Sequence, residues 1–292
     1  DTTEERTKAL DELSVYVKRD IKATLAVMDS KSITIRLLDP PLHEFVPHDK
    51  AKLQELSKEL GIRMSVLNRR ILALHETNPM LGHRGVRLGV SYPEITEMQL
   101  RAILEATGEL LKEGKKALPE IMIPVTMDKN ELLNQKAIVD RVYAEVCEKL
   151  GLKEIPYLYG TMIETPRAAL KANEMAEVTD FFSFGTNDLT QMSFGFSRDD
   201  IGGFLPKYLD LKILPEDPFV SIDQSGVGEL IRIAVEKARS VKPKIKLGIC
   251  GEHGGDAESV VFCHKIGMNY VSCSPFHVPI ARLAAAQAAI ED

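Results

Sequence analysis

The sequence contains no tryptophan and only four cysteines among its 292 residues. These are Cys147, Cys250, Cys263 and Cys273, which form no C-x-x-C pair and none of the spacings of a structural zinc site. Three of them lie among apolar residues, where free thiols of reducing compartments are usually found. We therefore expect no disulfide framework and a cytoplasmic protein.

A basic excess and long apolar runs are also missing. The formal net charge of −6 argues against a general nucleic-acid binder, which normally carries a basic patch. No apolar stretch reaches the length of a membrane span, and residues 1–30 are charged throughout. We expect neither a nucleic-acid partner nor a membrane partner, and no signal peptide.

What is present is a regular alternation of short apolar runs with amphipathic helical stretches. The runs are not of the alternating polar and apolar kind, which is typical of a parallel sheet covered on both faces. We expect strands near residues 33, 86, 121, 159, 183, 247 and 271. We expect helices over 3–28, 49–60, 64–76, 94–114, 129–150, 166–178, 225–240, 256–266 and 279–291.

Seven such strands are one fewer than a closed (β/α)8 barrel contains. The chain opens on a predicted helix that no strand precedes. We therefore predict an α/β fold, a TIM-type barrel that lacks its first strand in this chain. Residues 1–292 would form one barrel domain of a larger, multidomain enzyme. An open doubly wound sheet is the alternative, although no G-x-G-x-x-G follows any of the strands.

Polar side chains gather where the predicted strands end. Burying such charges unpaired is costly, so their convergence indicates a pocket for an anionic, oxygen-rich ligand together with a divalent metal. Each also has a structural alternative: Arg36 could pair with Asp39, Glu164 could cap the next helix, and Cys250 could be a core thiol. The residues at strand ends are Arg36, Arg84, Glu164, Asn187, Asp188, Cys250 and Ser274.

The segment 181–191 is the clearest example. An apolar, aromatic run ends in Gly185, Thr186, Asn187 and Asp188, and a helical pattern follows. Gly185 would let the backbone approach a ligand closely, and Asp188 would place a carboxylate at the mouth of a strand. The alternative is that Asn187 or Asp188 caps the following helix.

Five motifs, in this order, resemble the C-terminal, phosphoenolpyruvate-binding barrel of the phosphoenolpyruvate-utilising enzymes. The resemblance runs from about residue 33 to the C-terminus. It is nearer to the pyruvate phosphate dikinases than to phosphoenolpyruvate synthase or to enzyme I of the sugar phosphotransferase system. The motifs are Thr-Ile-Arg-Leu-Leu-Asp-Pro-Pro (34–41), Asn-Pro-Met-Leu-Gly-His-Arg-Gly (78–85), Met-Ile-Glu (162–164), Phe-Ser-Phe-Gly-Thr-Asn-Asp-Leu-Thr-Gln (182–191) and Gly-Ile-Cys-Gly-Glu-His-Gly-Gly (248–255).

The resemblance implies Mg²⁺-dependent phosphoryl transfer between a phosphohistidine carrier domain and the enolate of pyruvate, which interconverts pyruvate and phosphoenolpyruvate. This would be one partial reaction of a phosphotransferase that converts ATP, phosphate and pyruvate to AMP, diphosphate and phosphoenolpyruvate. The implied partners are pyruvate or phosphoenolpyruvate, the carrier domain and a second copy of the chain in a homodimer. The chain lacks the family's Thr-Ser-His-Ala and Arg-Thr-Glu motifs, so this fragment alone is not expected to run the overall reaction.

Position by position, the resemblance implies that Glu164 and Asp188 are the Mg²⁺ ligands. Arg36 and Arg84 would clamp the transferring phosphoryl group and the enolate oxygen, a task for which planar guanidinium groups are well suited. Cys250 would be the acid/base at the methyl carbon of pyruvate, where an ordinary thiol pKa of about 8.5 would serve.

The same comparison implies that Gly185, Thr186 and Asn187 bind the substrate carboxylate through backbone N–H groups and an amide. Three alternatives remain at this stage. The barrel could be of the phosphoenolpyruvate synthase kind, it could be a metal-dependent aldolase or lyase acting on pyruvate, or it could be a catalytically incomplete barrel that serves as a dimerisation module.

Overall fold

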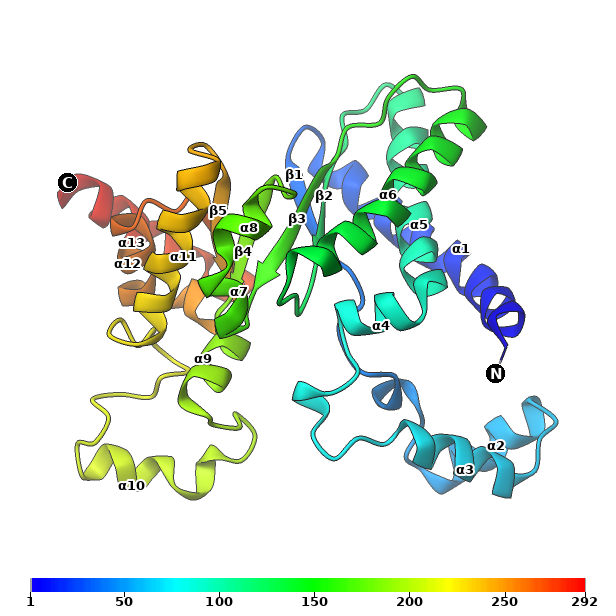
Figure 1. Ribbon diagram of the computed structural model, residues 1–292, viewed down its shortest axis with the longest axis horizontal. Coiled ribbons are helices and arrows are strands. Elements are labelled where there is room, and N and C mark those ends of the chain that lie inside the picture. Colours follow the sequence, from blue (N-terminus) through cyan, green and yellow to red (C-terminus); the bar gives the residue numbers. More distant parts are fainter. Residues whose placement is uncertain (1, 292) are drawn as a thin grey trace.

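The computed structural model describes residues 2–291. At its centre lies a single sheet of parallel strands in the order β1-β2-β3-β4-β5-β6, each paired with the next along the chain (Figure 1). This sequential parallel order is that of a barrel wall rather than of a doubly wound sheet. The strands are β1 (Ser32–Arg36), β2 (Leu118–Ile123), β3 (Leu158–Ile163), β4 (Phe181–Gly185), β5 (Lys246–Cys250) and β6 (Tyr270–Val271).

The sheet is strongly curled. Lys246 Nζ on β5 lies 2.5 Å from Glu120 Oε1 on β2 and 3.3 Å from Ser32 Oγ on β1. In a flat sheet β1 and β5 would lie about 19 Å apart, since neighbouring strands are spaced by about 4.8 Å. These contacts therefore cross the concave face, and the fold is an α/β half-barrel, which confirms the predicted parallel α/β class.

The two faces of the sheet differ in polarity. The convex face is apolar and packs against helices, with Ile121, Ile163, Phe182 and Leu247 fully buried in the main core. The concave face mixes apolar side chains such as Met122 with polar ones that lie toward both ends of the strands. The expectation of a sheet that is covered on both faces is thus correct only for the convex side.

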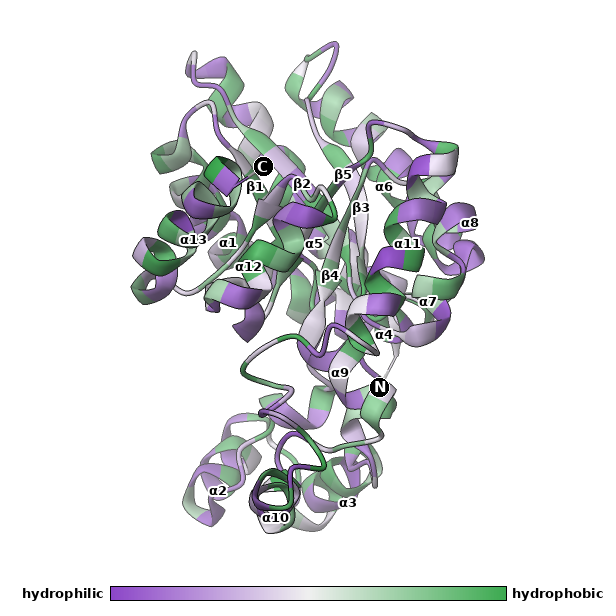
Figure 2. Ribbon diagram, turned by 90° about the vertical axis from the view of Figure 1, so that its left-hand side faces the viewer, coloured by the Kyte–Doolittle hydropathy of each residue, from purple (hydrophilic) through white to green (hydrophobic). Residues whose placement is uncertain are grey.

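Helices cover the convex face and follow the sequence prediction closely (Figures 1 and 2). The helix α1 packs on α5, α5 on α6, α11 on α7 and α8, and α12 on α13. A capping box at Asp128 and a left-handed Gly151 fix the two ends of α6. These helices are α1 (Thr3–Met28), α5 (Pro93–Lys112), α6 (Lys129–Leu150), α7 (Pro166–Leu170), α8 (Ala172–Ala176), α11 (Val227–Val241), α12 (Ala257–Lys265) and α13 (Val278–Glu291).

The strand predicted near residue 86 is wrong. A 3-10 turn, η2 (Pro79–Leu81), and a helix, α4 (Val86–Ser91), occupy that region, and β1 pairs directly with β2. Gly85 has a φ of 56°, and a Cβ added there would lie 2.7 Å from a side-chain carbon of Val125. Because only glycine tolerates this close, left-handed turn, the chain bends into a helix instead of running on as a strand.

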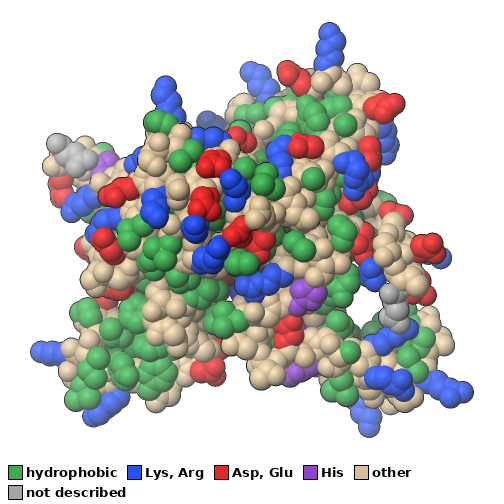
Figure 3. Space-filling model, in the orientation of Figure 1, with side chains coloured by type: hydrophobic (Ala, Val, Ile, Leu, Met, Phe, Trp, Pro, Cys, Tyr) green, Lys and Arg blue, Asp and Glu red, His purple; other side chains and the backbone are tan. Residues whose placement is uncertain are grey.

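Two excursions extend from the carboxyl end of the sheet on the same side of the molecule (Figures 1 and 2). The first, residues 42–81, contains η1 (Leu42–Phe45), α2 (Lys50–Glu59) and α3 (Met64–Leu74), and the second, residues 197–223, contains η3 (Ile201–Gly203) and α10 (Leu205–Asp210). Figure 3 shows apolar side chains gathered over the lobe that holds α10. Among residues 2–291, no helix has both the length and the apolar character needed to cross a membrane.

Candidate functional site

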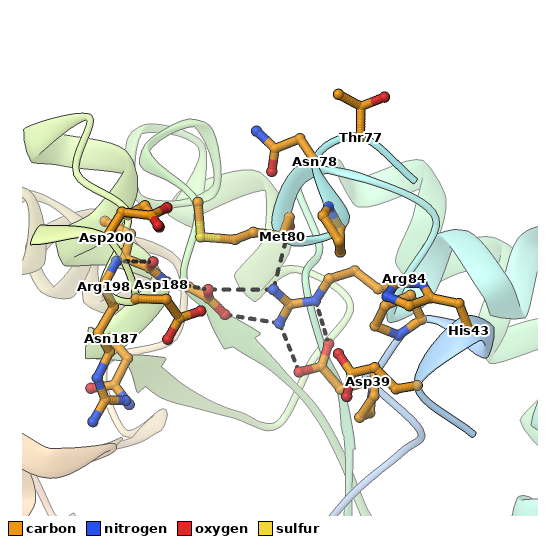
Figure 4. A pocket seen from close by; sticks show the side chains of 17 residues that line it. Asp39, His43, Thr77, Asn78, Met80, Arg84, Asn187, Asp188, Arg198 and Asp200 are labelled. Atoms are coloured by element: carbon orange, nitrogen blue, oxygen red, sulfur yellow. Dashed lines mark hydrogen bonds and ion pairs between the residues drawn. The ribbon is translucent and has the colours of Figure 1, made fainter. Parts of the chain in front are cut away.

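A hollow of about 670 Å³ opens at the carboxyl end of the sheet, between the two excursions (Figure 4). Its wall includes Asp39, which follows β1, and Arg84, which lies in the turn before α4. Asn187 and Asp188 reach it from the first turn of α9 (Thr186–Phe194). Loops and a helix start thus supply this wall, whereas the sequence placed Arg84 and Asp188 at strand ends.

Arg84 joins two carboxylates in this hollow (Figure 4). Its Nε and Nη2 donate to Asp39 at 3.1 and 2.7 Å. Its Nη2 and Nη1 donate to Asp188 at 2.9 and 3.4 Å, and Nη1 also donates to the Met80 carbonyl at 3.3 Å. Burial alone would lower the pKa of Arg84, but the hydrogen bonds to Asp39 and Asp188 outweigh it and raise that pKa.

Arg84 therefore uses all of its donors within the protein. A guanidinium group has five N–H donors, and the structure gives Arg84 five hydrogen bonds. Because the residue is only 9% exposed, this pairing offsets the cost of burying its charge. The bound carboxylates hold the arginine at one place in the wall of the hollow.

Glu164 follows β3 directly and is 2% exposed. Its Oε1 accepts a hydrogen bond of 2.5 Å from the Val125 N–H. Burial raises the pKa of Glu164 well above its ordinary range, and the negative charges of Asp188 and Asp39 raise it further. Two acidic groups that repel each other at a buried position are the kind of pair that a bound cation stabilises.

Gly185, the last residue of β4, makes room for this carboxylate. A Cβ added at Gly185 would lie 2.6 Å from Glu164 Oε2 and 2.7 Å from the Met162 sulfur. The sequence suggested glycine at this position so that a ligand could approach the backbone closely. The structure shows a second reason for glycine here, which is the close approach of the Glu164 side chain. The cap of α9 is Gly185 itself and has no side-chain hydrogen bond, so neither Asn187 nor Asp188 is the capping residue.

A prediction follows for the protein without divalent metal. Replacing Glu164→Gln should raise the melting temperature near pH 8 by roughly 2–4 °C, the shift that about 1 kcal/mol produces in a domain of this size. A carboxyl whose pKa is higher in the folded state stabilises the fold fully below its unfolded pKa. That stability is lost as the pH rises toward the folded pKa. Glutamine keeps the acceptor for Val125 without the charge.

Thermal unfolding in EDTA at pH 4 and pH 8 measures this effect, and the gain should be confined to the higher pH. Glu177→Gln is the matched control, because Glu177 is exposed and its partner is Lys129 on the surface. An equal gain at both pH values, or a loss at pH 8, would show that Glu164 is not a destabilising buried charge.

A second hollow, of about 340 Å³, lies on the concave face of the sheet. It contains Arg36 at the end of β1 and Cys250 at the end of β5, with Ser183 and Tyr270 in its wall. Cys250 packs against Met122, Met162 and Phe181, and its thiol lies 3.6 Å from the Phe184 carbonyl oxygen. Of the predicted residues, Arg84, Asn187 and Asp188 line the first hollow and Arg36 and Cys250 the second. The buried Glu164, Gly185 and Thr186 line neither. The bond from Arg36 Nη1 to Asp39 Oδ2, 2.8 Å long, links the two hollows.

The environment of Cys250 favours its protonated form. Burial raises the pKa of the thiol to about 11, while a hydrogen bond to Ser183 and the charge of Arg36 lower it in part. The nearby charges of Glu164 and Asp188 raise it again. The sequence-based expectation of an ordinary thiol pKa is therefore wrong, and the group is suited to donating a proton at neutral pH rather than to resting as a thiolate.

The turn that follows Cys250 is tied to α9. His253 is fully buried, and burial lowers the pKa of its ring. Its Nε2–H donates to the Pro218 carbonyl at 2.9 Å, and its Nδ1 accepts from the Thr186 hydroxyl at 2.7 Å. The Thr186 hydroxyl also lies 3.0 Å from the Cys250 carbonyl oxygen. Thr186 therefore has its side chain engaged within the protein.

The residues at this edge fit a magnesium ion through their donor set. Glu164 and Asp188 supply two hard carboxylate oxygens, of the kind that Mg²⁺ prefers. Within residues 2–291, no three or more His, Cys, Asp or Glu side chains are grouped so that they could hold a metal ion. An ion held by this pair would keep positions for water and substrate oxygens, as Mg²⁺ usually does at phosphate-transfer sites.

Most of the sequence-predicted site residues meet at the carboxyl edge of the sheet, and Ser274 lies beyond β6 and lines neither hollow. The sequence named Asp39 only as a structural partner of Arg36, a pairing that the structure confirms. Its bonds to Arg84 escaped prediction, although its place directly after β1 was a usable signal. Gln191 was not predicted as a site residue either, although its amide lies 3.3 Å from Asp188 Oδ1.

A curled parallel sheet with carboxylates, arginines and a thiol at its carboxyl edge is typical of enzyme domains of the α/β class. Residues 2–290 match the family model described as the PEP-utilising enzyme, PEP-binding domain. The chain belongs to the PEP-utilising enzymes and corresponds to this domain of them.

Among curated proteins, the chain is similar to several pyruvate, phosphate dikinases. It is 54% identical to that of Clostridium symbiosum over 100% of this chain and 33% of the relative. It is 54% identical to pyruvate, phosphate dikinase 2 of Zea mays over 98% of this chain and 32% of the relative. It is 51% identical to the dikinase of Entamoeba histolytica over 99% of this chain and 34% of the relative. The chain thus spans about a third of the length of these relatives.

Proposed function

We propose that this domain catalyses the pyruvate half-reaction of a pyruvate, phosphate dikinase. In it, a phosphoryl group passes between a histidine on a carrier domain and the enolate oxygen of pyruvate. In the direction of phosphoenolpyruvate synthesis, the N–P bond of the phosphohistidine breaks, an O–P bond forms at the enolate oxygen, and a methyl proton of pyruvate passes to the protein. The observation that carries the proposal is the set of Arg84, Asp188, Glu164 and Cys250 at one sheet edge, in a chain similar to dikinases along its whole length.

In this proposal Glu164 and Asp188 hold Mg²⁺, which when bound acidifies the methyl protons of pyruvate and offsets the charge that develops on its oxygen. The carboxylate of the substrate accepts hydrogen bonds from backbone N–H groups at the start of α9, over residues 185–187, and from the Asn187 amide. These N–H groups have no partner within the helix and lie at its positive end. The Cys250 thiol donates a proton to the methylene carbon when phosphoenolpyruvate is converted to pyruvate, and its thiolate accepts a methyl proton in the opposite direction.

Arg36 and Arg84 stabilise the transferring phosphoryl group and the enolate oxygen in this scheme. Arg36 does so through its free N–H donors and Arg84 through its charge, because all five Arg84 donors are engaged within the protein. Replacing either with lysine keeps one charge but loses the planar fork, so turnover of the full-length protein should fall by about a hundredfold or more. For Arg84→Lys we also expect a lower melting temperature, because five hydrogen bonds cannot be replaced by three donors. Steady-state kinetics measure the first effect and thermal unfolding the second.

Arg87→Lys is the matched control, since Arg87 lies on the same segment and donates to the Leu81 and Gly82 carbonyls. It should keep turnover within about threefold. Near-normal turnover in Arg36→Lys or Arg84→Lys would show that the arginine replaced does not stabilise the transferring phosphoryl group.

We also propose that the half-barrel is part of a (β/α)8 barrel, closed between β6 and β1 by strands that lie elsewhere in a longer, multidomain protein. The contacts of Lys246 with Glu120 and Ser32 support it, because the curl of the sheet already brings β5 toward β1. The carrier domain would then approach the 670 Å³ hollow between the two excursions, which is larger than pyruvate alone requires.

A homodimer is a further part of the proposal, and α13 is the element that supports it. Its alanines Ala281, Ala284 and Ala288 are buried within the domain, whereas Leu283 and Ile290 are 61% and 84% exposed. A helix that turns such large apolar residues to solvent is a candidate for an interface. The mass in solution should be that of a dimer at micromolar concentration, and Leu283→Glu should shift it toward the monomer. A monomeric mass for the unaltered protein would contradict the dimer.

The test of the proposed function is deuterium exchange into the methyl group of pyruvate by the full-length protein, followed by NMR in D₂O. We expect exchange that needs Mg²⁺ and that oxalate inhibits. Binding of oxalate without exchange would indicate a domain that binds the substrate but does not act on it. If neither binding nor exchange occurred, the domain would be a structural module.

A further inference from the structure

One carboxylate connects the two arginines of the site. Asp39 Oδ2 accepts hydrogen bonds from Arg36 Nη1 at 2.8 Å and from Arg84 Nη2 at 2.7 Å. Its Oδ1 accepts from Arg84 Nε at 3.1 Å, and its side chain is 7% exposed. Because Arg36 ends β1 and Arg84 precedes α4, Asp39 sets the separation of two guanidinium groups that come from different segments.

Asp39 is itself fixed in place by its backbone. Its carbonyl oxygen accepts a hydrogen bond of 2.9 Å from the Gly85 N–H, next to Arg84. The preceding Leu38 N–H donates to the Gln99 side chain at 2.7 Å. Pro40 follows, and a residue before proline is restricted to extended conformations. The carboxylate is therefore a fixed point against which both arginines are held.

The two arginines differ in what they have left to offer a ligand. Arg84 is buried and has all five donors engaged within the protein. The side chain of Arg36 is 43% exposed and lines the hollow that contains Cys250. Among residues 2–291 it is hydrogen-bonded to Asp39, through one Nη1 donor. Arg36 is thus the arginine with a free fork, and its orientation depends on Asp39.

We propose that Asp39 is a positioning residue that presents the free fork of Arg36 to the enolate oxygen and the phosphoryl group of the substrate, while it holds Arg84 against Asp188. The inference rests on the proposed function. Asp39 touches neither substrate nor metal in this scheme and acts through the two arginines. Without its charge, Arg36 would sample many rotamers. An amide in place of the carboxylate would also leave one of the Arg84 groups, Nε or Nη2, facing an NH2 donor instead of an acceptor.

The experiment compares Asp39→Asn with the unaltered full-length protein, with oxalate as the probe in the presence of Mg²⁺. Calorimetry should show oxalate affinity reduced by about tenfold to a hundredfold, the scale of lost charge-assisted hydrogen bonds. A purely electrostatic effect has the opposite sign, because removing a negative charge should tighten the binding of an anion. Asp199→Asn is the matched control: it removes the same charge from the rim of the same hollow, where Asp199 is exposed, and should change the affinity less than twofold.

A second comparison separates positioning from a general structural role. If Asp39 acts through Arg36, the double variant Asp39→Asn with Arg36→Lys should bind oxalate about as weakly as the weaker single variant. If the two residues act independently, the losses should multiply, and the positioning role is excluded. Unchanged affinity in Asp39→Asn would exclude it as well.

If Asp39→Asn does not fold, Asp39→Glu gives the answer, because it keeps the charge and moves the carboxylate by one methylene. Positioning predicts a loss of about fivefold or more, since a displacement near 1 Å disturbs an oriented site. Wild-type affinity in Asp39→Glu would overturn the proposal. Failure of the proposed function is distinguishable, because the unaltered protein would then show no Mg²⁺-dependent oxalate binding at all.

Discussion

Asp188→Asn should abolish Mg²⁺-dependent binding of oxalate, with a loss of affinity on the order of a hundredfold or more. Asp188 and Glu164 are the two carboxylates that we assign to the metal, and the charge of Asp188 raises the pKa of the buried Glu164. An amide supplies one neutral oxygen in place of an anionic ligand, so the affinity of the site for Mg²⁺ collapses and the metal-dependent part of oxalate binding is lost with it. Titration calorimetry with oxalate, with and without Mg²⁺, measures the effect.

The fold should survive this change, because Arg84 keeps its two bonds to Asp39. Circular dichroism and thermal unfolding check that point. Asp200→Asn is the control, since Asp200 lines the same hollow at its exposed rim. Undiminished metal dependence in Asp188→Asn would show that this carboxylate does not hold the ion.

Cys250→Ala should lose exchange of the methyl protons of pyruvate, by about a hundredfold or more, yet keep Mg²⁺-dependent binding of oxalate. General acid–base groups contribute on the order of a hundredfold to ten-thousandfold. The thiol ends β5 and lies among apolar side chains, with its pKa raised to about 11 by burial. Transfer of the phosphoryl group between enolate oxygen and phosphohistidine needs no proton at carbon, so that step should be affected far less.

Cys263→Ala is the matched control, because Cys263 is a buried thiol of the core that lies outside both hollows. It should cost stability and leave exchange unchanged. If exchange persists in Cys250→Ala, a neighbouring residue and not Cys250 must be the acid/base at the methyl carbon. The nearest histidine in sequence, His253, has both ring nitrogens engaged with Thr186 and Pro218, so a new acid would have to be sought on the concave face.

The helices could be predicted from sequence because their signals are local. The apolar periodicity of α1, α5, α6 and α11 locates their ends to within two residues, and capping boxes mark the starts of α1 and α6. The helix expected over 166–178 is divided at Lys171 into α7 and α8. The strand predicted near residue 86 is wrong for a non-local reason. β1 pairs directly with β2, which leaves no position between them for another strand, and no sequence pattern reveals this pairing.

The site was predictable as far as strand ends position it. Glu164 and Cys250 lie where β3 and β5 end, as the rule for parallel sheets requires. Arg84 and Asp188 reach the hollow from a turn and from the first turn of α9, and their bonds depend on how distant loops fold back. The raised pKa of Cys250 and the double role of Asp39 depend on burial and on three-dimensional contacts, which a linear sequence does not contain.

The most direct test of the account is transfer of the phosphoryl group itself. The full-length protein that carries this domain should be incubated with Mg²⁺ and with phosphoenolpyruvate that carries a radioactive phosphoryl group, in the absence of nucleotide. We expect acid-labile label on a histidine of the protein, one pyruvate released for each label bound, and a rate about a hundredfold lower in Arg36→Lys. Pyruvate released together with free labelled phosphate, and no label on the protein at any time, would contradict it.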